Sequence, residues 1–272
     1  MKFLRSLFYF LLGSMILKLQ CIGQADRLFY DAVRSEAAGD LDQAINLYLK
    51  ASALSHSANL HGNLANLYFK KEQFGHSILH FRKALLLNPR DTELVANLNF
   101  AYEMANLSPP LQNFTNTYFS VNFLSFWIII CVIVFWVGLL ILFYLLFFKT
   151  SRKPFLYFTT GWILVFSMCF FATNLCLKQK SELGREVISH LPSIENNHSK
   201  TIPLRRFAGE SNSVNTNILP GESLIIQLGN NGTNKSHQIA NGNTWYLARS
   251  TNGKKKGWIR EDEFGWIIDP NS

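Results

Sequence analysis

The sequence predicts a multidomain membrane protein: an α-helical repeat domain, two transmembrane helices and a small all-β domain, in that order. Three observations predict this architecture. Two uncharged apolar runs occupy the middle of the 272-residue chain. Amphipathic segments that recur at a constant offset precede these runs. Short β-branched segments, broken by Gly, Asn and Pro, follow them. Helical and strand periodicities separate the two kinds of soluble domain.

Residues 1–25 have the pattern of a signal peptide. Two cations precede the apolar stretch 7–17, and small residues stand at positions 23 and 25, which a signal peptidase inspects. We expect cleavage after Ala25. Two alternatives remain open: an uncleaved anchor with the same topology, and a lipoprotein attached through Cys21. The second is disfavoured because polar residues stand where a lipoprotein signal has apolar and small ones.

Residues 26–107 contain an internal repeat. The segment Leu41 to Ala51 aligns with Phe74 to Ala84 at a constant offset of 33 residues, and each copy has apolar residues at helical spacing. A second amphipathic segment precedes Phe74, and Pro89 ends the last helix of that copy. A helix pair that recurs at this period is typical of a solenoid.

This segment resembles a tetratricopeptide repeat domain. The copy from Ala58 to Asp91 carries the motif residues Leu64, Ala65, Tyr68, Phe81, Ala84 and Pro89. The chain holds about two and a half such repeats, fewer than the three that a free-standing solenoid needs. We therefore expect the membrane, the neighbouring domain or a partner to cap it. The resemblance implies a protein-binding groove on the first helices, at Asn59, Gly62, Asn66, Phe69, Lys70, Ala96 and Phe100.

His76 and His80 are four residues apart on one predicted helix, a spacing that metal ligands also use. No third ligand accompanies them, so we expect a solvated helix face. We predict no metal site and no cofactor.

Residues 108–122 form a linker, and residues 123–148 and 155–177 are the two predicted transmembrane helices. Each run exceeds the roughly 20 apolar residues that cross a bilayer core. The turn 149–154 between them holds three cations, and short basic loops stay in the cytoplasm. We therefore predict a two-pass protein of a bacterial inner membrane with both soluble domains on the periplasmic side.

The net charge of +8 does not indicate a nucleic-acid ligand. The signal segment and the hairpin turn together hold six cations and no acid, so most of the excess belongs to membrane flanks. The four cysteines lie in the signal segment and the apolar runs, which leaves no disulfide framework for either soluble domain.

Residues 178–272 contain the strand-like runs TIPLRRF, ILPGESLIIQL, TWYLARS and GWIR between turn-rich pieces, which predicts a small antiparallel barrel. These runs resemble a bacterial SH3-like domain, with a first strand within residues 187–198. Trp245, Tyr246 and Trp258 are the candidate ligand surface, for a peptide or a cell-wall glycopeptide. The alternative, which we prefer, is that Trp245 and Trp258 fill the core of so small a domain.

The sequence carries no hydrolase elbow, nucleotide-binding loop or zinc-protease motif, so we predict an interaction protein and not an enzyme. The order signal, repeats, membrane hairpin and SH3-like domain resembles the BatE-type members of the bacterial Bat (Bacteroides aerotolerance) family. This resemblance implies an envelope scaffold beside membrane-bound von Willebrand A domain proteins and, indirectly, a MoxR-type ATPase. The alternative hypothesis is a protein that binds or senses peptidoglycan through the SH3-like domain.

Overall fold

The computed structural model describes residues 23–109, 123–148, 152–191, 201–239 and 242–270. The chain forms two compact units. One unit combines the segments Met1–Pro109 and Glu186–Ser272, and the other is the segment Pro110–Arg185 between them. Residues 1–22 of the predicted signal segment and residues 110–122 of the predicted linker lie outside the described residues.

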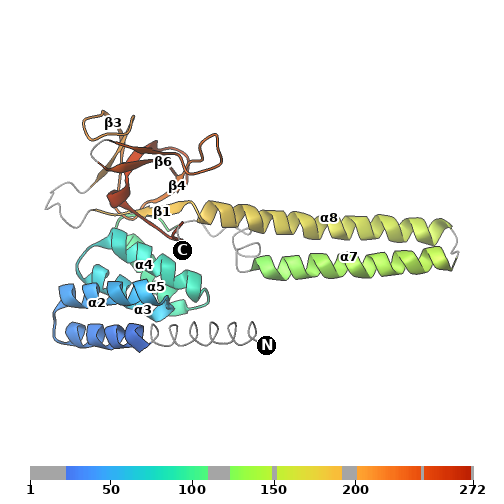
Figure 1. The fold of residues 1–272 in the computed structure, drawn as a ribbon, viewed down its shortest axis with the longest axis horizontal. Coiled ribbons are helices and arrows are strands. Elements are labelled where there is room, and N and C mark those ends of the chain that lie inside the picture. Colours follow the sequence, from blue (N-terminus) through green and yellow to red (C-terminus); the bar gives the residue numbers. More distant parts are fainter. Residues whose placement is uncertain (1–22, 110–122, 149–151, 192–200, 240–241, 271–272) are drawn as a thin grey trace, which may run out of the picture. The chain divides into compact units, whose positions relative to one another are not determined.

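The N-terminal helices form a stack in which each helix packs on the next along the chain (Figure 1). Residues 23–37 are helical, followed by α2 (Leu41–Leu54), α3 (Ala58–Lys70), α4 (Phe74–Leu87) and α5 (Thr92–Met104). Side chains accept hydrogen bonds at three of the N-termini: Asp40 from the Gln43 N–H, Ser57 from the Leu60 N–H, and Asp91 from the Glu93 and Leu94 N–H groups. Such N-caps explain why the helices begin where they do.

Small and large residues alternate in the core of this helical stack, as predicted from the repeated spacing. Ala44, Ala65 and Ala101 are fully buried, so neighbouring helices approach closely. The larger buried side chains are Tyr48, Leu64, Leu67, Ile78, Phe81 and Tyr102. The predicted helices of residues 26–107 are therefore confirmed, together with the inward direction of their periodic residues.

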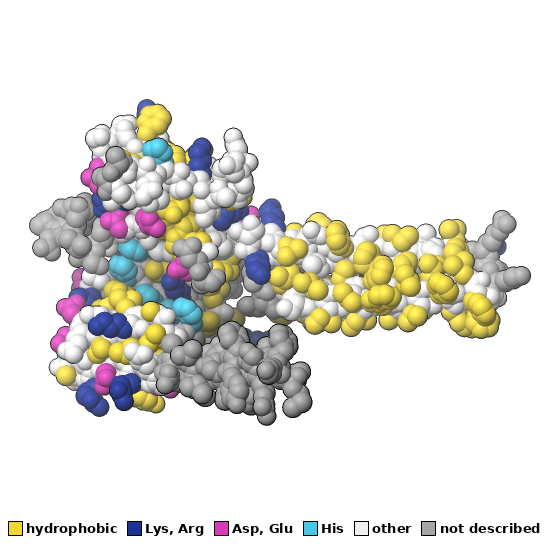
Figure 2. Space-filling view, in the orientation of Figure 1, with side chains coloured by type: hydrophobic (Ala, Val, Ile, Leu, Met, Phe, Trp, Pro, Cys, Tyr) yellow, Lys and Arg dark blue, Asp and Glu magenta, His cyan; other side chains and the backbone are white. Residues whose placement is uncertain are grey.

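The second unit is a pair of packed helices, α7 (Leu124–Phe147) and α8 (Arg152–Leu183). Both are long and apolar enough to cross a membrane, and yellow hydrophobic side chains cover them in Figure 2. Their closest approach is at Gly138, where an added Cβ would lie 1.9 Å from Nε1 of Trp162. That indole Nε1 donates a hydrogen bond of 3.0 Å to the carbonyl of Val134.

The predicted bounds of the second apolar helix were too short. Helix α8 begins at Arg152, inside the predicted turn, and ends at Leu183, six residues beyond Leu177. Proline is tolerated in the first turn of a helix, where its missing N–H has no intrahelical acceptor, so Pro154 does not stop it. At the other end polar helix-forming residues continue the helix until Gly184. Residues 149–151 of the predicted turn lie outside the described residues.

The C-terminal segment folds into an antiparallel sheet, which we call the β-domain (residues 186–270). Its strands pair in the order β3-β2-β7-β6-β4-β1-β8, and β5 also pairs with β6. The bounds are β1 Glu186–Ser189, β2 Ile202–Arg205, β3 Val214–Ile218, β4 Ser223–Ile226, β5 Ser236–Gln238, β6 Thr244–Ser250, β7 Lys256–Arg260 and β8 Phe264–Trp266. A one-turn 3-10 helix, Glu261–Glu263, joins the last two strands.

Each strand-like run of the sequence coincides with a strand (β2, β4, β6 or β7), which confirms the predicted antiparallel sheet. The first strand is found at Glu186–Ser189, at the start of the predicted segment, and residues 192–200 lie outside the described residues. The core contains the fully buried side chains Val187, Leu204, Leu224, Ile226 and Ile259. The β-domain packs on α4 through β1 and β8.

Candidate functional site

The candidate groove residues lie on α3 and α5. Each of these is the first helix of a predicted repeat, and the two repeats are consecutive. Asn59, Gly62, Asn66, Phe69 and Lys70 belong to α3, and Ala96 and Phe100 belong to α5. The structure brings the two aromatic residues together: the ring centroids of Phe69 and Phe100 are 5.3 Å apart, with the planes tilted by 34°. Phe74, at the start of α4, meets Phe69 edge on at 5.5 Å.

The candidate groove residues differ in how exposed their side chains are. Phe100 is 51% exposed, which is unusual for a Phe side chain in a soluble domain, and Asn59 and Ala96 are also exposed. Gly62 is buried, and an added Cβ would lie 3.1 Å from Cδ2 of Leu94. We therefore assign Gly62 to the close packing of α3 against α5, not to ligand contact.

The basic candidate of the groove already has a partner. Lys70 Nζ lies 2.8 Å from a carboxylate oxygen of Glu36, on the helix of residues 23–37. Such an exposed ion pair is worth only about 0–1 kcal/mol, so it opens readily to a stronger acidic partner.

Sequence reasoning missed Met104, which is 47% exposed on α5. It follows Phe100 by four residues and therefore lies on the same helix face. That spacing was the signal that could have found it. Phe69, Phe100 and Met104 form the surface that we call the aromatic groove.

The candidate ligand residues of the β-domain have three different environments. Trp245 is fully buried, so it is a core residue, in agreement with the preferred interpretation. Tyr246 is half-buried and contacts Phe264 and Trp266 edge on, at 5.6 and 5.7 Å. Trp258 is also half-buried, and the exposed His237 meets its ring edge on at 6.5 Å.

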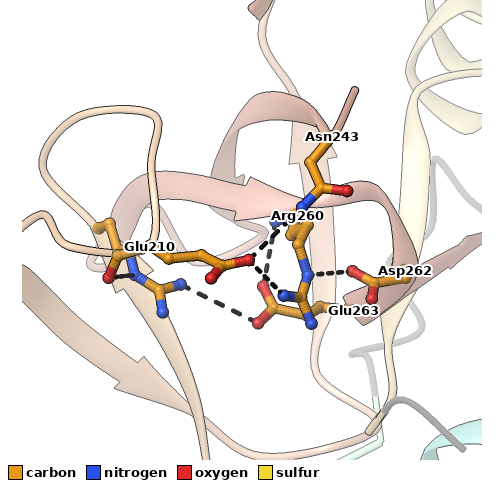
Figure 3. A network of polar contacts seen from close by, with 6 residues as sticks. Glu210, Asn243, Arg260, Asp262 and Glu263 are labelled. Atoms are coloured by element: carbon orange, nitrogen blue, oxygen red, sulfur yellow. Dashed lines mark hydrogen bonds and ion pairs between the residues drawn. The ribbon is translucent and has the colours of Figure 1, made fainter. Parts of the chain in front are cut away.

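Figure 3 shows a polar network in the β-domain that includes Glu210, Asn243, Arg260, Asp262 and Glu263. The Arg205 guanidinium carbon lies 5.1 Å from the centroid of the Trp245 ring, a cation–π contact. The same guanidinium donates through Nε to the carbonyl of Glu210 and lies 4.0 Å from the Glu263 carboxylate. Arg260 donates to the side chain of Glu210 at 2.9 Å and also pairs with Asp262.

The network ties the loop between β2 and β3 to the 3-10 helix. Burial raises the pKa of the Glu263 carboxyl, although the Arg260 N–H and the two guanidinium groups favour its charged form. Glu210 accepts hydrogen bonds from Arg260 at 2.9 Å and from Asn243 at 3.4 Å, so its side chain links the β2–β3 loop to the end of β7 and to the residue before β6.

The expectation of a solvated helix face for His76 and His80 is wrong. His80 is 6% exposed, and its Nδ1 lies 3.2 Å from Nδ1 of His61, which is 5% exposed on α3. His76 lies on the same face of α4, and its ring stacks on that of His190, just after β1, with centroids 4.0 Å apart. The sequence could not reveal this because the rings that cover the two histidines come from other elements: His61 and Tyr68 of α3, and His190 after β1.

Tyr68 connects the two histidine pairs. Its ring stacks on His76 at 4.7 Å and on His80 at 5.4 Å. We call the rings of His61, His80, Tyr68, His76 and His190 the histidine stack. Among the described residues no group of three or more His, Cys, Asp or Glu side chains is placed to hold a metal ion.

The histidines of this stack are neutral near pH 7. Burial, with the cations and imidazoles nearby, lowers the pKa of His61 to about 4 and that of His76 to about 3. Burial likewise holds the pKa of His80 well below its usual range and lowers the pKa of His190. The contact between His61 and His80 also requires neutral rings, because one ring donates the hydrogen bond and the other accepts it.

No protein-family model matches the chain, and no curated protein matches it.

Proposed function

We propose that the chain is a two-pass scaffold protein of a bacterial inner membrane that presents two protein-interaction modules outside the cytoplasm. In this proposal α7 and α8 cross the membrane as a hairpin, and the cations of residues 149–153 face cytoplasmic lipid headgroups. The helical stack is a tetratricopeptide repeat domain, and the β-domain is an SH3-like module.

The observation that supports this proposal most strongly is the aromatic groove. Phe69 and Phe100 come from two first helices and meet on a surface where Phe100 stays half exposed. Aromatic and Met side chains are enriched at the centres of protein interfaces, where they supply much of the binding energy. A peptide segment laid across α3 and α5 would cover both rings.

The partners proposed for the aromatic groove are membrane-bound von Willebrand A domain proteins of the Bat type, with a MoxR-type ATPase reached through them. These partners follow from the resemblance in domain order. Anchoring both modules to one membrane hairpin raises their effective concentration toward a partner in the same membrane, so two weak contacts suffice.

Crosslinking in native membranes tests the scaffold role. A photo-crosslinking residue at Asn59, an exposed candidate groove residue at the start of α3, is expected to capture a von Willebrand A protein. Phe100→Ala should abolish this capture. Leu87→Ala is the matched control, because Leu87 is similarly exposed at 49% but lies on α4, away from the groove. Equal capture by both variants would show that the groove is not the binding surface.

Reporter fusions test the topology separately. A fusion at Thr150 is expected to be active only in the cytoplasm, and fusions at Leu107 and Ser272 only outside it. An external Thr150 would overturn both the topology and the partner assignment.

Peptidoglycan binding is a second candidate function, favoured by the half-buried Trp258 and the exposed His237 beside it. The full chain in detergent, sedimented with cell-wall sacculi, tests it. Binding that Trp258→Ala weakens and Val214→Ala, exposed on β3 two strands away, leaves intact would support this candidate. Absence of sedimentation would exclude it.

A further inference from the structure

The helical stack and the β-domain meet at an interface built around α4. At Gly75 the α4 backbone reaches the end of β1, where an added Cβ would lie 2.7 Å from the carbonyl oxygen of Ser189. At Gly265 of β8 an added Cβ would lie 2.3 Å from a methyl group of Leu79. At Gly75 the neighbour is backbone, so a side chain there would separate the two domains, whereas at Gly265 the Leu79 side chain would have to move.

A buried ion pair crosses the same interface. Arg82 Nη2 of α4 donates to both carboxylate oxygens of Glu186, the first residue of β1, at 2.9 Å. The side chains are only 18% and 16% exposed, so the two charges depend on each other for compensation. The β-domain therefore covers one face of α4.

The stacked rings of His76 and His190 form the centre of this interface, one from each domain. Their centroids are 4.0 Å apart, and Nε2 of His76 is buried without a hydrogen-bond partner. An unpartnered buried nitrogen has no acceptor to stabilise an added proton. Two imidazolium rings at this separation would also repel each other.

The charged groups around the two rings are mixed in sign. Lys83 of α4 disfavours protonation of His190, and Asp262 of the 3-10 helix favours it. His190 itself disfavours protonation of His76, whereas the carbonyl of Leu191 favours it. Lys83 in turn interacts with Asp269, which follows β8. No carboxylate contacts His76 among the described side chains, and burial dominates for both rings.

We infer that the His76–His190 pair is an acid-operated latch, which holds the β-domain on the helical stack at neutral pH and releases it as the surroundings acidify. Release exposes the α4 face and frees the β-domain from the helical stack. The physical behaviour is independent of the proposed function. Its physiological use rests on the proposed extracytoplasmic location, because an envelope compartment follows the external pH.

The sign of the effect follows from linkage. The docked state keeps both rings neutral, while a released histidine has a pKa near 6.5. Below that value the released state binds more protons, so docking is stable above about pH 6.5 and weakens as pH falls. Between pH 6.5 and its docked pKa of about 3, His76 contributes about tenfold per pH unit to the ratio of released to docked protein. His190, whose pKa burial also lowers, adds to this slope in the same direction.

Spin-label distance measurements on the full chain in nanodiscs test this latch. Labels are placed on the exposed positions Lys50 of α2 and Asn230 of the β-domain, with the native cysteines replaced by alanine. A single narrow distance is expected at pH 7.5, and a second, broad population should grow toward pH 4.5. Below about pH 6.5 the logarithm of the released-to-docked ratio should rise by between about 1 and 2 for each unit by which the pH falls. A narrow distance throughout, or a slope below 1, overturns the inference.

Ring-preserving variants assign the slope to the two histidines. His190→Phe should lower it to about 1, and the double variant with His76→Phe should lower it to about 0, because phenylalanine keeps the stack but binds no proton. The control is His237→Phe, an exposed histidine outside the interface, which should keep the original slope. If the double variant keeps that slope instead, the interface carboxylates drive release and the latch is not histidine-based.

The outcomes for the latch and for the proposed function are distinguishable. The distance measurement is made on purified protein and does not depend on topology or partners. A positive distance result with cytoplasmic Leu107 and Ser272 fusions would support the latch and refute the proposed location.

Discussion

The ion pair between Arg82 and Glu186 gives the sharpest prediction about how the two soluble domains hold together. Glu186→Ala leaves the Arg82 guanidinium, whose side chain is 18% exposed, without its bidentate acceptor. Removing one partner of a buried pair costs about 3–5 kcal/mol. At about 1.4 kcal/mol per tenfold, the docked-to-released ratio should therefore fall by a factor of roughly 100 to 4,000.

The same spin-label pair measures this change at pH 7.5, across a urea titration that populates both states. The double variant Arg82→Met with Glu186→Ala should recover most of the loss, because an apolar pair leaves no buried charge unpaired. Arg34→Ala is the control, since its pair with Asp31 is exposed and worth about 0–1 kcal/mol. A cost below about 1 kcal/mol for Glu186→Ala, or no recovery in the double variant, would refute the reasoning.

Three further outcomes are expected. Trp245→Ala should lower the free energy of unfolding of the β-domain by about 3–5 kcal/mol, measured by urea denaturation, because the whole indole is buried. Gly138→Leu should separate α7 from α8, seen as faster proteolysis in detergent, because its side chain needs the space of Trp162; unchanged proteolysis would contradict this packing. The free energy of unfolding of the helical stack should fall by up to about 3 kcal/mol from pH 6.5 to 4, because His61 stays neutral until its pKa of about 4; His61→Phe should remove this part of the decrease.

Periodicity predicted the helices of the stack and the direction of their core residues because local spacing controls both. Tyr48 and Phe81 occupy equivalent positions in the two copies, and both are buried. Phe69 and Phe100 were both assigned to the groove from the resemblance, but the contact between their rings was not predicted, because the two residues are not at equivalent positions of the repeat. Gly62 was assigned to the groove because its helix face is right, but its contact with Leu94 depends on how closely α5 approaches.

Composition predicts where a helical segment lies better than it predicts the residue at which the helix ends, as the bounds of α8 show. The apolar run stops near Leu177, but the helix continues to Leu183, since Lys, Gln and Glu are good helix formers. The end of an apolar run marks a change of solvent, whereas the end of a helix needs a residue such as Gly184 that leaves the helical conformation.

Whether a candidate ligand residue of the β-domain is exposed depends on how deeply it lies in the fold, which the sequence of a short strand does not determine. Trp245 and Tyr246 are adjacent and point to opposite faces of β6, and alternation alone favoured one of them as exposed. In the fold both faces are covered near Trp245, because Arg205 from another strand lies over its ring.

The sequence by itself determined the order of the segments, the two apolar helices, the repeated helical core and the antiparallel sheet. These follow from hydrophobic periods and from run lengths, which are local properties of the chain. Only the tertiary structure decided that β1 and β8 would pack on α4, and that His80 is buried and His76 half-buried, not solvated. The burial of a helix face depends on which distant segment packs against it, here residues more than 100 positions further along the chain, as Arg82 and Glu186 show.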